Sequence, residues 1–189
     1  KNFWSKIVEG NDNSSNLLFG DAGSATVIAQ QVDSDISFVF GSDGSSFESI
    51  IVDNSNNKKT NNKNDFLTMN GAEVFTFTLK RIPQLIKDTL VYSKLNKDDI
   101  NHCIFHQANL FMLKTLARSI DINFDKFLIS IDKYGNTSSA SIPVTICHNR
   151  EKIVKNPENI LMAGFGVGLS WSTAVSDLKE TVILPILEV

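Results

Sequence analysis

The chain has 189 residues, of which 42% are hydrophobic and 21% charged, with ten glycines and four prolines. This composition suits one folded domain with a core of ordinary size, and it excludes the disordered, collagen-like and disulfide-scaffold classes. The net charge of −3 excludes a global basic field that would hold a nucleic acid or an anionic membrane.

The cysteine content and the absence of long apolar runs bear on the cellular compartment in which the protein is expected. Cys103 and Cys147 lack the paired spacing of a disulfide framework or a zinc site, which favours a reducing cytoplasm and no bound metal. No run approaches the roughly eighteen apolar residues of a membrane span, and the N-terminal sequence lacks the layout of a secretory signal. We therefore expect a soluble cytoplasmic protein.

The first third of the chain has the texture of strands and turns. Strands are predicted at 16–32, 36–40 and 49–52, separated by the turn-rich stretches GDAGS and GSDGSS. A polar stretch without apolar anchors follows at 53–65 and is predicted to be an exposed, flexible loop without catalytic residues.

A helical pattern begins after Asn70. Apolar residues recur at three- and four-residue steps from Val74 to Leu90, and Glu73 follows Asn70 at the spacing of a capping box. Pro83 is expected to kink or divide this helix.

Strands and helices alternate through the rest of the chain. We predict a strand at 100–105, a helix at 110–120, a strand at 127–131 and a helix at 140–154 with Pro143 in its first turn; a strand at 160–163, a glycine loop at 164–168 and a last strand at 169–178 follow. This is the α/β pattern, in which ligands bind beyond the carboxyl ends of the strands. Three loops qualify, namely those of His106 and Asn136 and the glycine loop.

These three loops share hydrogen-bond donors. His106 offers an imidazole N–H, Asn136 an amide N–H, and GFGVG backbone N–H groups that a ligand can approach closely. Donors focused on one carbonyl oxygen stabilise negative charge that develops there, each contributing about 3 to 4 kcal/mol in the transition state. Taken singly, each also has a structural interpretation: a satisfied histidine after a strand, a turn asparagine before a helix cap, and tight strand packing at the glycines.

Five short motifs in a fixed order identify a protein family more specifically than any one of them does alone. FGDAGSA (19–25), MNGAEVF (69–75), HQAN (106–109), YGNTSSASIP (134–143) and GFGVGLSW (164–171) together resemble the C-terminal half of the β-ketoacyl-[acyl-carrier-protein] synthase III family. The resemblance implies the α/β, thiolase-like fold: a half-repeat with a mixed five-stranded sheet and helices on its faces, within a duplicated five-layered protein. Residues 34–189 would form the C-terminal domain, and residues 1–33 the last segment of the first half.

The resemblance also implies an activity and a Cys-His-Asn site. In the family, a cysteine attacks an acyl-coenzyme A thioester, and a malonyl-carrier protein then loses carbon dioxide and condenses with the bound acyl group. His106 and Asn136 match the pair that holds the malonyl thioester oxygen, and the backbone N–H of Val167 matches an oxyanion-hole position. Coenzyme A and phosphopantetheine thioesters would be substrates, without a cofactor or metal.

Four further residues match substrate-binding positions of the family. Asn109 and Gly71 match positions near the pantetheine arm, while Phe75 and Met112 match positions that line the acyl pocket. The family is typically dimeric, so the full-length protein is expected to be a homodimer.

The nucleophilic cysteine of the family lies in the first half, outside this chain. Cys103 is expected to point away from the His106 side of its strand, and Cys147 to pack in a helix, so that neither thiol acts as the nucleophile. We therefore expect the chain alone to be inactive. It would be a fragment of a longer synthase or a subunit that meets a separate N-terminal half.

A second departure from the family is Phe111, which stands where a basic residue commonly helps to dock the acidic carrier protein. Lys114 and Arg118 lie further along the same predicted helix. Phe111 leaves open an acyltransferase that uses coenzyme A thioesters without a carrier protein. A non-catalytic scaffold half also stays open, whereas a Cys-His-Asn peptidase is disfavoured because neither cysteine lies at a helix start.

Overall fold

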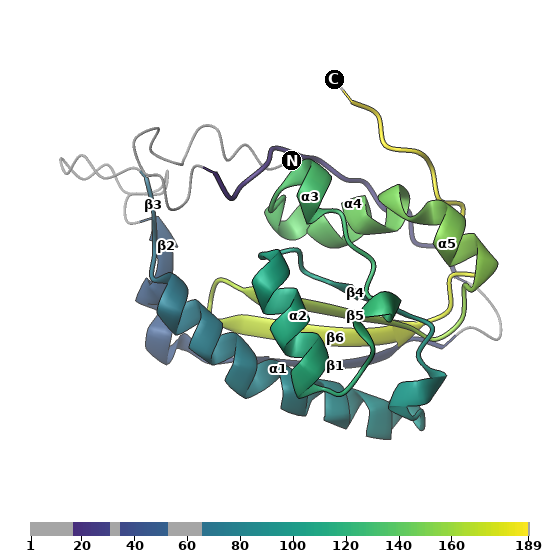
Figure 1. The fold of residues 1–189 in the computed structure, drawn as a ribbon, viewed down its shortest axis with the longest axis horizontal. Coiled ribbons are helices and arrows are strands. Elements are labelled where there is room, and N and C mark those ends of the chain that lie inside the picture. The colour runs from purple at the N-terminus through teal and green to yellow at the C-terminus, as the bar shows by residue number, and fades with distance from the viewer. Residues whose placement is uncertain (1–16, 31–34, 53–65, 189) are drawn as a thin grey trace.

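The computed structural model describes residues 17–30, 35–52 and 66–188. Its centre is a four-stranded mixed sheet in the order β1-β6-β5-β4, and a two-stranded sheet, β2-β3, lies beside it (Figure 1). Only β4 and β5 run parallel within the four-stranded sheet. The strands are β1 (Ser37–Ser42), β2 (Ile50–Val52), β3 (Leu67–Met69), β4 (His102–Phe105), β5 (Ile160–Gly166) and β6 (Ser170–Ser176).

Helices cover both faces of this sheet, as the sequence predicted. The helices α1 and α2 lie on one face and α4 and α5 on the other, with the short α3 next to α4 (Figure 1). Their bounds are α1 (Gly71–Ser93), α2 (Leu110–Ser119), α3 (Ile131–Tyr134), α4 (Ser141–His148) and α5 (Arg150–Lys155). In the described ranges, none of these helices combines the length and the apolar composition that a bilayer crossing requires.

The alternation of side chains along β4 divides the core into two layers. Cys103 and Phe105 pack in the larger cluster, which contains the buried residues of α1 and α2, whereas Ile104 packs in the cluster that contains Ile153 of α5. All three β4 side chains are fully buried. The position immediately after Phe105 therefore belongs to the face that α4 and α5 cover.

The cap of α1 is only partly the one predicted. The Asn70 side-chain oxygen accepts the Glu73 backbone N–H at 3.2 Å, as expected. The Glu73 carboxylate, however, accepts the Ser49 hydroxyl at 2.5 Å, and the Asn70 backbone N–H donates to the Ser49 carbonyl at 2.8 Å. Of the two expectations for Pro83, a kink or a division, the division is wrong, because α1 continues through the proline to Ser93.

The predicted strand at 127–131 is reduced to a single bridge between Phe127 and Cys103, so the described sheet has four strands instead of five. The buried side chain of Gln107 explains the difference. Its Nε2 donates to the Leu128 carbonyl at 3.4 Å, and its Oε1 accepts the Ser130 backbone N–H at 3.1 Å. A side chain therefore satisfies backbone groups that a strand neighbour would otherwise pair.

Two other predicted elements differ in the structure. Within 17–30 the chain forms isolated bridges and no strand, and Val27 and Ile28 are 94% and 90% exposed. The predicted helix at 140–154 breaks into α4 and α5 at Asn149, whose side chain donates to the carbonyls of Ile129 and Thr145 at 3.0 and 3.1 Å. The predicted loop at 53–65 and the proposed domain boundary at 33/34 lie outside the described residues.

Candidate active site

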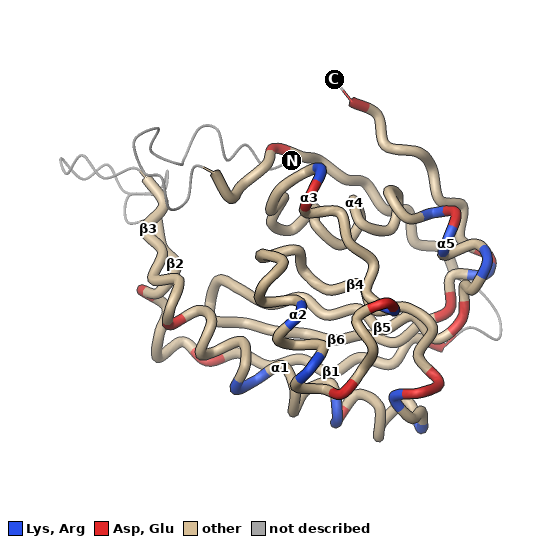
Figure 2. The backbone as a smooth tube through the Cα atoms, viewed as in Figure 1, with Lys and Arg blue, Asp and Glu red and all other residues tan. Residues whose placement is uncertain are grey.

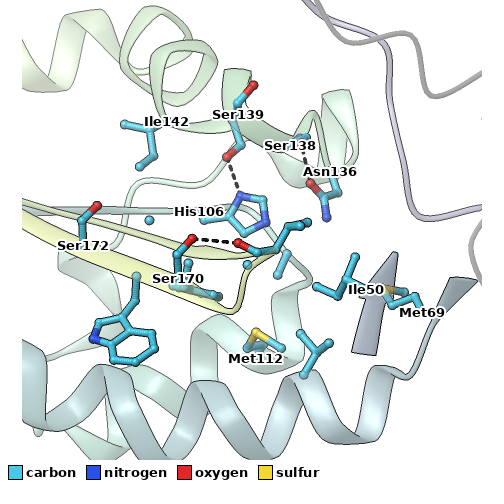
Figure 3. Close-up of a pocket in the computed structure, with 18 of the residues that line it drawn as sticks. Ile50, Met69, His106, Met112, Asn136, Ser138, Ser139, Ile142, Ser170 and Ser172 are labelled. Atoms are coloured by element: carbon cyan, nitrogen blue, oxygen red, sulfur yellow. Dashed lines mark hydrogen bonds between the residues drawn. The ribbon is translucent and has the colours of Figure 1, made fainter. Parts of the chain in front are cut away.

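The three loops singled out in the sequence line one cavity of about 820 Å³ at the carboxyl ends of β4 and β5. Figure 3 shows His106, Asn136 and several serines entering this space from different elements. Val167, in the turn after β5, lies at its edge and is 63% exposed. The convergence of an imidazole and a carboxamide on one cavity is therefore a property of the fold.

The predicted substrate-binding residues divide between two places. Asn109, Gly71 and Met112 line the cavity. Phe75 is not among its lining residues; its ring stacks on Phe111, with centroids 5.6 Å apart and planes 18° from parallel. The structure therefore does not bring Phe75 to the cavity with the other three.

One backbone contact and two ring contacts fix His106. The His106 backbone N–H donates to the Ala163 carbonyl at 2.7 Å, which extends the β4–β5 ladder by one residue. The ring meets the edge of Phe165 at a centroid distance of 5.5 Å and an angle of 85°. Its Nδ1 lies 2.7 Å from the Ser141 hydroxyl, at the start of α4. The ring is thus held by neighbours from β5 and α4.

The position of this ring makes it neutral. Burial lowers the pKa of His106 from 6.5 to about 4, and a backbone contact with Ser138 opposes the shift in part. At neutral pH the imidazole therefore carries one N–H and one lone pair. It can donate one hydrogen bond and accept another while carrying no charge.

We expect this lowered pKa to appear in the pH dependence of stability. Between pH 6.5 and 4 the unfolded chain binds a proton at His106 that the folded chain does not, so the free energy of unfolding falls as pH falls through this window. The part of the free energy of unfolding that depends on a neutral His106 is fully present above pH 6.5. Urea unfolding at pH 7 and pH 4.5 should show a steeper loss for the unmodified chain than for His106→Gln, and equal losses would contradict the assignment.

Asn136 is buried, 6% exposed, with its side-chain oxygen already engaged. The oxygen accepts the Ser138 backbone N–H at 2.9 Å, which leaves the amide NH₂ as the group that faces other partners. The backbone of Asn136 pairs with residues 18–20: its N–H donates to the Leu18 carbonyl at 2.8 Å, and its carbonyl accepts the Gly20 N–H at 3.0 Å. A distant N-terminal segment thus helps to place this residue.

Replacing Gly20 by alanine is expected to displace the segment that holds Asn136. A Cβ at Gly20 would lie 2.0 Å from the Tyr134 carbonyl oxygen, a backbone atom that cannot move away cheaply. Overpacking of this kind costs about 1 to 3 kcal/mol. Urea unfolding should report that loss for Gly20→Ala, whereas Gly44→Ala, whose Cβ meets no atom within 4 Å, serves as the control. Equal stability of the two variants would contradict the close approach.

The glycine run is divided between a strand and a turn. Gly164 and Gly166 are the last glycines of β5, and Val167 and Gly168 form the turn into β6. Gly168 has φ of +138°, a conformation that favours glycine. The Val167 carbonyl accepts the Ser170 hydroxyl at 2.7 Å, which braces this turn beside the cavity.

Asn109 serves first as a helix cap. Its side-chain oxygen accepts the Met112 backbone N–H at 2.7 Å at the start of α2. Its amide nitrogen remains for a ligand in the cavity that it lines. Asn109 therefore resembles Asn136, since in both a backbone N–H occupies the carboxamide oxygen.

Hydroxyl groups of the cavity were missed in the sequence analysis. The lining includes six serines: Ser42, Ser138, Ser139, Ser141, Ser170 and Ser172. The other side is apolar, with Ile50, Met69 and Met112 among its residues. The motif YGNTSSASIP contains three of these serines, but serine is so common in turns that no pattern distinguished them.

The described residues that line the cavity include no Lys, Arg, Asp or Glu. In Figure 2 the charged positions lie around the outside of the helices and connecting turns. Among the described residues, no group of three His, Cys, Asp or Glu side chains is placed to hold a metal ion. Charge that develops on a bound ligand would therefore meet neutral donors in the part of the cavity that this chain supplies.

Neither cysteine is placed as a nucleophile. Cys103 lies in the core cluster with α1 and α2, on the opposite face of β4 from the α4 side, as predicted. Burial raises the pKa of the Cys103 thiol to about 12 and also raises the pKa of Cys147 in α4. Both thiols keep their protons at neutral pH, and a protonated thiol is a poor nucleophile.

Both a family sequence model and curated proteins match the part of the chain that contains this site. The sequence model of the family described as 3-oxoacyl-[acyl-carrier-protein] synthase III, C terminal, matches residues 90–178, a range that contains His106, Asn136 and Val167. A β-ketoacyl-[acyl-carrier-protein] synthase III of Clostridium tetani is 35% identical over 186 residues, covering 90% of this chain and 56% of the relative. A synthase III of Staphylococcus aureus is 35% identical over 170 residues, covering 88% and 52%.

Solved structures agree in fold. The 3-oxoacyl-(acyl-carrier protein) synthase of Burkholderia xenovorans superimposes with a TM-score of 0.86 at 34% identity, over 97% of this chain and 56% of that one. The synthase III of Aquifex aeolicus gives a TM-score of 0.80 at 31% identity, over 92% and 54%. The chain thus spans about half the length of the curated relatives it matches.

Proposed function

The chain is the C-terminal half of a β-ketoacyl-[acyl-carrier-protein] synthase III-like protein with the thiolase-like fold, and on this basis we propose that it supplies the histidine and the asparagine of a decarboxylating condensation site. The observation that carries the proposal is the shared cavity of His106 and Asn136. Both are neutral at pH 7, and Asn136 already directs its oxygen away to a backbone N–H.

The chemistry needs two donors on one oxygen. When a malonyl thioester loses carbon dioxide, the electrons of the breaking C–C bond move to the thioester carbonyl, and its oxygen becomes an enolate. His106 and Asn136 would donate hydrogen bonds to that oxygen. The enolate carbon then attacks an acyl group held as a cysteine thioester, a C–C bond forms, and the cysteine thiolate leaves. The backbone N–H of Val167 would stabilise the oxyanion of that attack.

The cysteine itself belongs to the partner that we propose, an N-terminal half joined to this chain or bound to it. Acyl-coenzyme A would load that cysteine, and malonyl-carrier protein would provide the second thioester. We place the assembled protein in the cytoplasm as a homodimer. Asn109, Gly71 and Met112 would contact the substrate arm and acyl chain within the cavity, and we retain Phe75 as an acyl-pocket contact that the N-terminal half would have to complete.

Intact-mass measurement with acyl-coenzyme A tests whether the acylated cysteine lies in the N-terminal half and not in this chain. The assembled protein should gain one acyl group, and peptide mapping should place it outside Cys103 and Cys147. This chain alone should gain none. Malonyl-carrier protein added to the loaded protein should then yield 3-oxoacyl product. An acyl group on either cysteine of this chain, or loading without any condensation, would contradict the proposal. No mass increase in the assembled protein would favour a non-catalytic scaffold.

Phe111 supports a second candidate, in which malonyl-coenzyme A replaces the carrier-bound thioester. Phe111 is 67% exposed at the start of α2 and stacks on Phe75, forming an aromatic surface instead of a cationic one. Lys114 and Arg118 lie further along α2, and the tube of α2 carries the blue of basic residues in Figure 2. Rates with malonyl-coenzyme A and with malonyl-carrier protein at equal concentrations separate the two candidates.

A further inference from the structure

A hydroxyl behind the candidate catalytic histidine has no role in the family resemblance described above. Ser141 is the first residue of α4, is 1% exposed, and places its Oγ 2.7 Å from Nδ1 of His106. It joins the ring at the nitrogen opposite the one that remains for a ligand. This contact therefore bears on where the single proton of the neutral imidazole lies.

The tautomer decides whether His106 donates or repels. With the proton on Nε2, the ring offers a donor to an acceptor in the cavity. With the proton on Nδ1, Nε2 presents a lone pair, which would repel a carbonyl oxygen already bound by the Asn136 amide. A hydroxyl can donate to Nδ1 in the first tautomer or accept from it in the second, so the contact distance alone is compatible with both.

Ser141 is itself held in place by a buried hydrogen-bond network. Its carbonyl accepts the Thr145 hydroxyl at 2.7 Å, and that hydroxyl oxygen lies 2.7 Å from the Ser130 hydroxyl. Ser130 and Thr145 are 1% and 0% exposed. The first turn of α4 is thus tied to the segment before α3, and this fixes the distance from the serine to the imidazole.

We propose that Ser141 is a positioning residue, whose hydroxyl donates to Nδ1 of His106 and so keeps the imidazole proton on Nε2, facing the cavity. The catalytic consequence rests on the proposed function, because only there must His106 and Asn136 donate to the same oxygen. The tautomer is a property of this chain whether or not the condensation occurs. The competing arrangement is an Nδ1–H that donates toward Ser141 or the nearby Ser138 backbone.

Nitrogen-15 NMR of labelled histidine tests the tautomer directly. The chain has three histidines, and His106→Gln identifies the signals of His106 by their disappearance. At pH 7 the spectrum should show an unprotonated Nδ1 and a protonated Nε2 for His106. In Ser141→Ala the signals should shift toward a mixture of tautomers, whereas Ser141→Thr, which keeps a hydroxyl, should restore the original pattern.

Kinetics of the assembled protein give the second readout. Ser141→Ala should lower kcat of condensation roughly 10- to 100-fold, the range known for hydrogen-bond partners that orient metal-bound histidines. Acyl loading of the cysteine should not change. Ser93→Ala, which removes a hydroxyl bonded to the Leu90 carbonyl in the last turn of α1, is the control for a simple loss of a serine.

The outcomes separate this inference from the proposed function. A wild-type spectrum with the proton on Nδ1, or an unchanged tautomer in Ser141→Ala, overturns the role of Ser141. The wild-type spectrum is decisive even if Ser141→Ala fails to fold. The predicted tautomer in a protein that never condenses malonyl thioester would support the inference and contradict the function.

Discussion

Replacing His106 by alanine is expected to lower the condensation rate of the assembled protein roughly 10²- to 10³-fold while acyl loading of the cysteine continues. In the proposed site the variant would remove one of two donors to the enolate oxygen, and that oxygen would carry charge only after loading is complete. Because the ring is neutral with a pKa of about 4, its loss removes a hydrogen bond and not a charge. Single-turnover assays with preloaded protein and malonyl thioester measure this step alone.

His148→Ala is the matched control for the His106 variant. His148 is exposed at the end of α4, where its ring meets Tyr134 at a centroid distance of 5.4 Å, and it is not among the cavity-lining residues. His106→Gln should fall between the wild type and alanine, since glutamine retains an N–H donor. Full condensation activity in His106→Ala, or a loss of loading equal to the loss of condensation, would contradict the role assigned to this ring.

The parts of the fold predicted correctly from the sequence are those determined by local periodicity. Helix α1 was predicted from apolar residues at three- and four-residue steps and from the Asn70 cap, and the structure confirms both. Strand β6 lies close to its predicted bounds, and β5 begins where it was predicted but continues to Gly166, three residues into the predicted glycine loop. The two-faced burial of β4 likewise follows from alternation along one strand.

The predictions that failed concern elements whose structure depends on residues far away in the chain. Nothing near 127–131 indicates that the side chain of Gln107 will take the place of a strand neighbour. The segment 17–30 forms only isolated bridges, one of them between Phe19 and Asn136 from far along the chain. Pro83 remains inside α1 because tertiary packing of the buried face outweighs one lost backbone bond.

In the candidate site, too, local features were predicted and contacts between distant residues were not. The convergence of His106, Asn136 and the glycine turn was predicted, because loops after neighbouring strands gather at one edge of an α/β sheet. The serine behind the histidine was not, because its contact joins residues 35 positions apart and depends on the angle at which α4 meets β4. A sequence pattern can locate donors, but the groups that orient them are found in three dimensions.

The neutrality of the cavity fits the two uncharged donors that we propose. A lysine or arginine at this position would bind the malonyl carboxylate as strongly as the enolate that forms from it, and so would stabilise the ground state as well as the transition state. A neutral imidazole and an amide respond chiefly to the charge on the thioester oxygen. The absence of charged residues among the described lining of the cavity therefore suits a reaction in which one anion is consumed as another forms.

Asn136→Asp should reduce condensation by about 10³-fold or more, a larger loss than Asn136→Ala. The aspartate can still accept the Ser138 backbone N–H, which Asn136 accepts at 2.9 Å, so the loop geometry is kept. It replaces the amide donor by a carboxylate, which repels the enolate oxygen in addition to losing about 3 to 4 kcal/mol of donor stabilisation. Single-turnover condensation of preloaded protein measures the effect.

A matched substitution elsewhere separates this effect from a change in loop stability. Asn123 makes the same local bond, its side-chain oxygen accepting the Asp125 backbone N–H at 3.0 Å, and it lies outside the cavity lining. Asn123→Asp should therefore leave condensation unchanged. Urea unfolding should show a larger loss of stability for Asn136→Asp, because its carboxylate is buried and that of Asn123→Asp is exposed, so condensation is compared under conditions in which both variants are folded. Equal condensation rates in Asn136→Asp and Asn136→Ala would contradict the assignment. They would mean that a negative charge at this position has no effect on the reaction, so the Asn136 amide could not be donating to a developing anion.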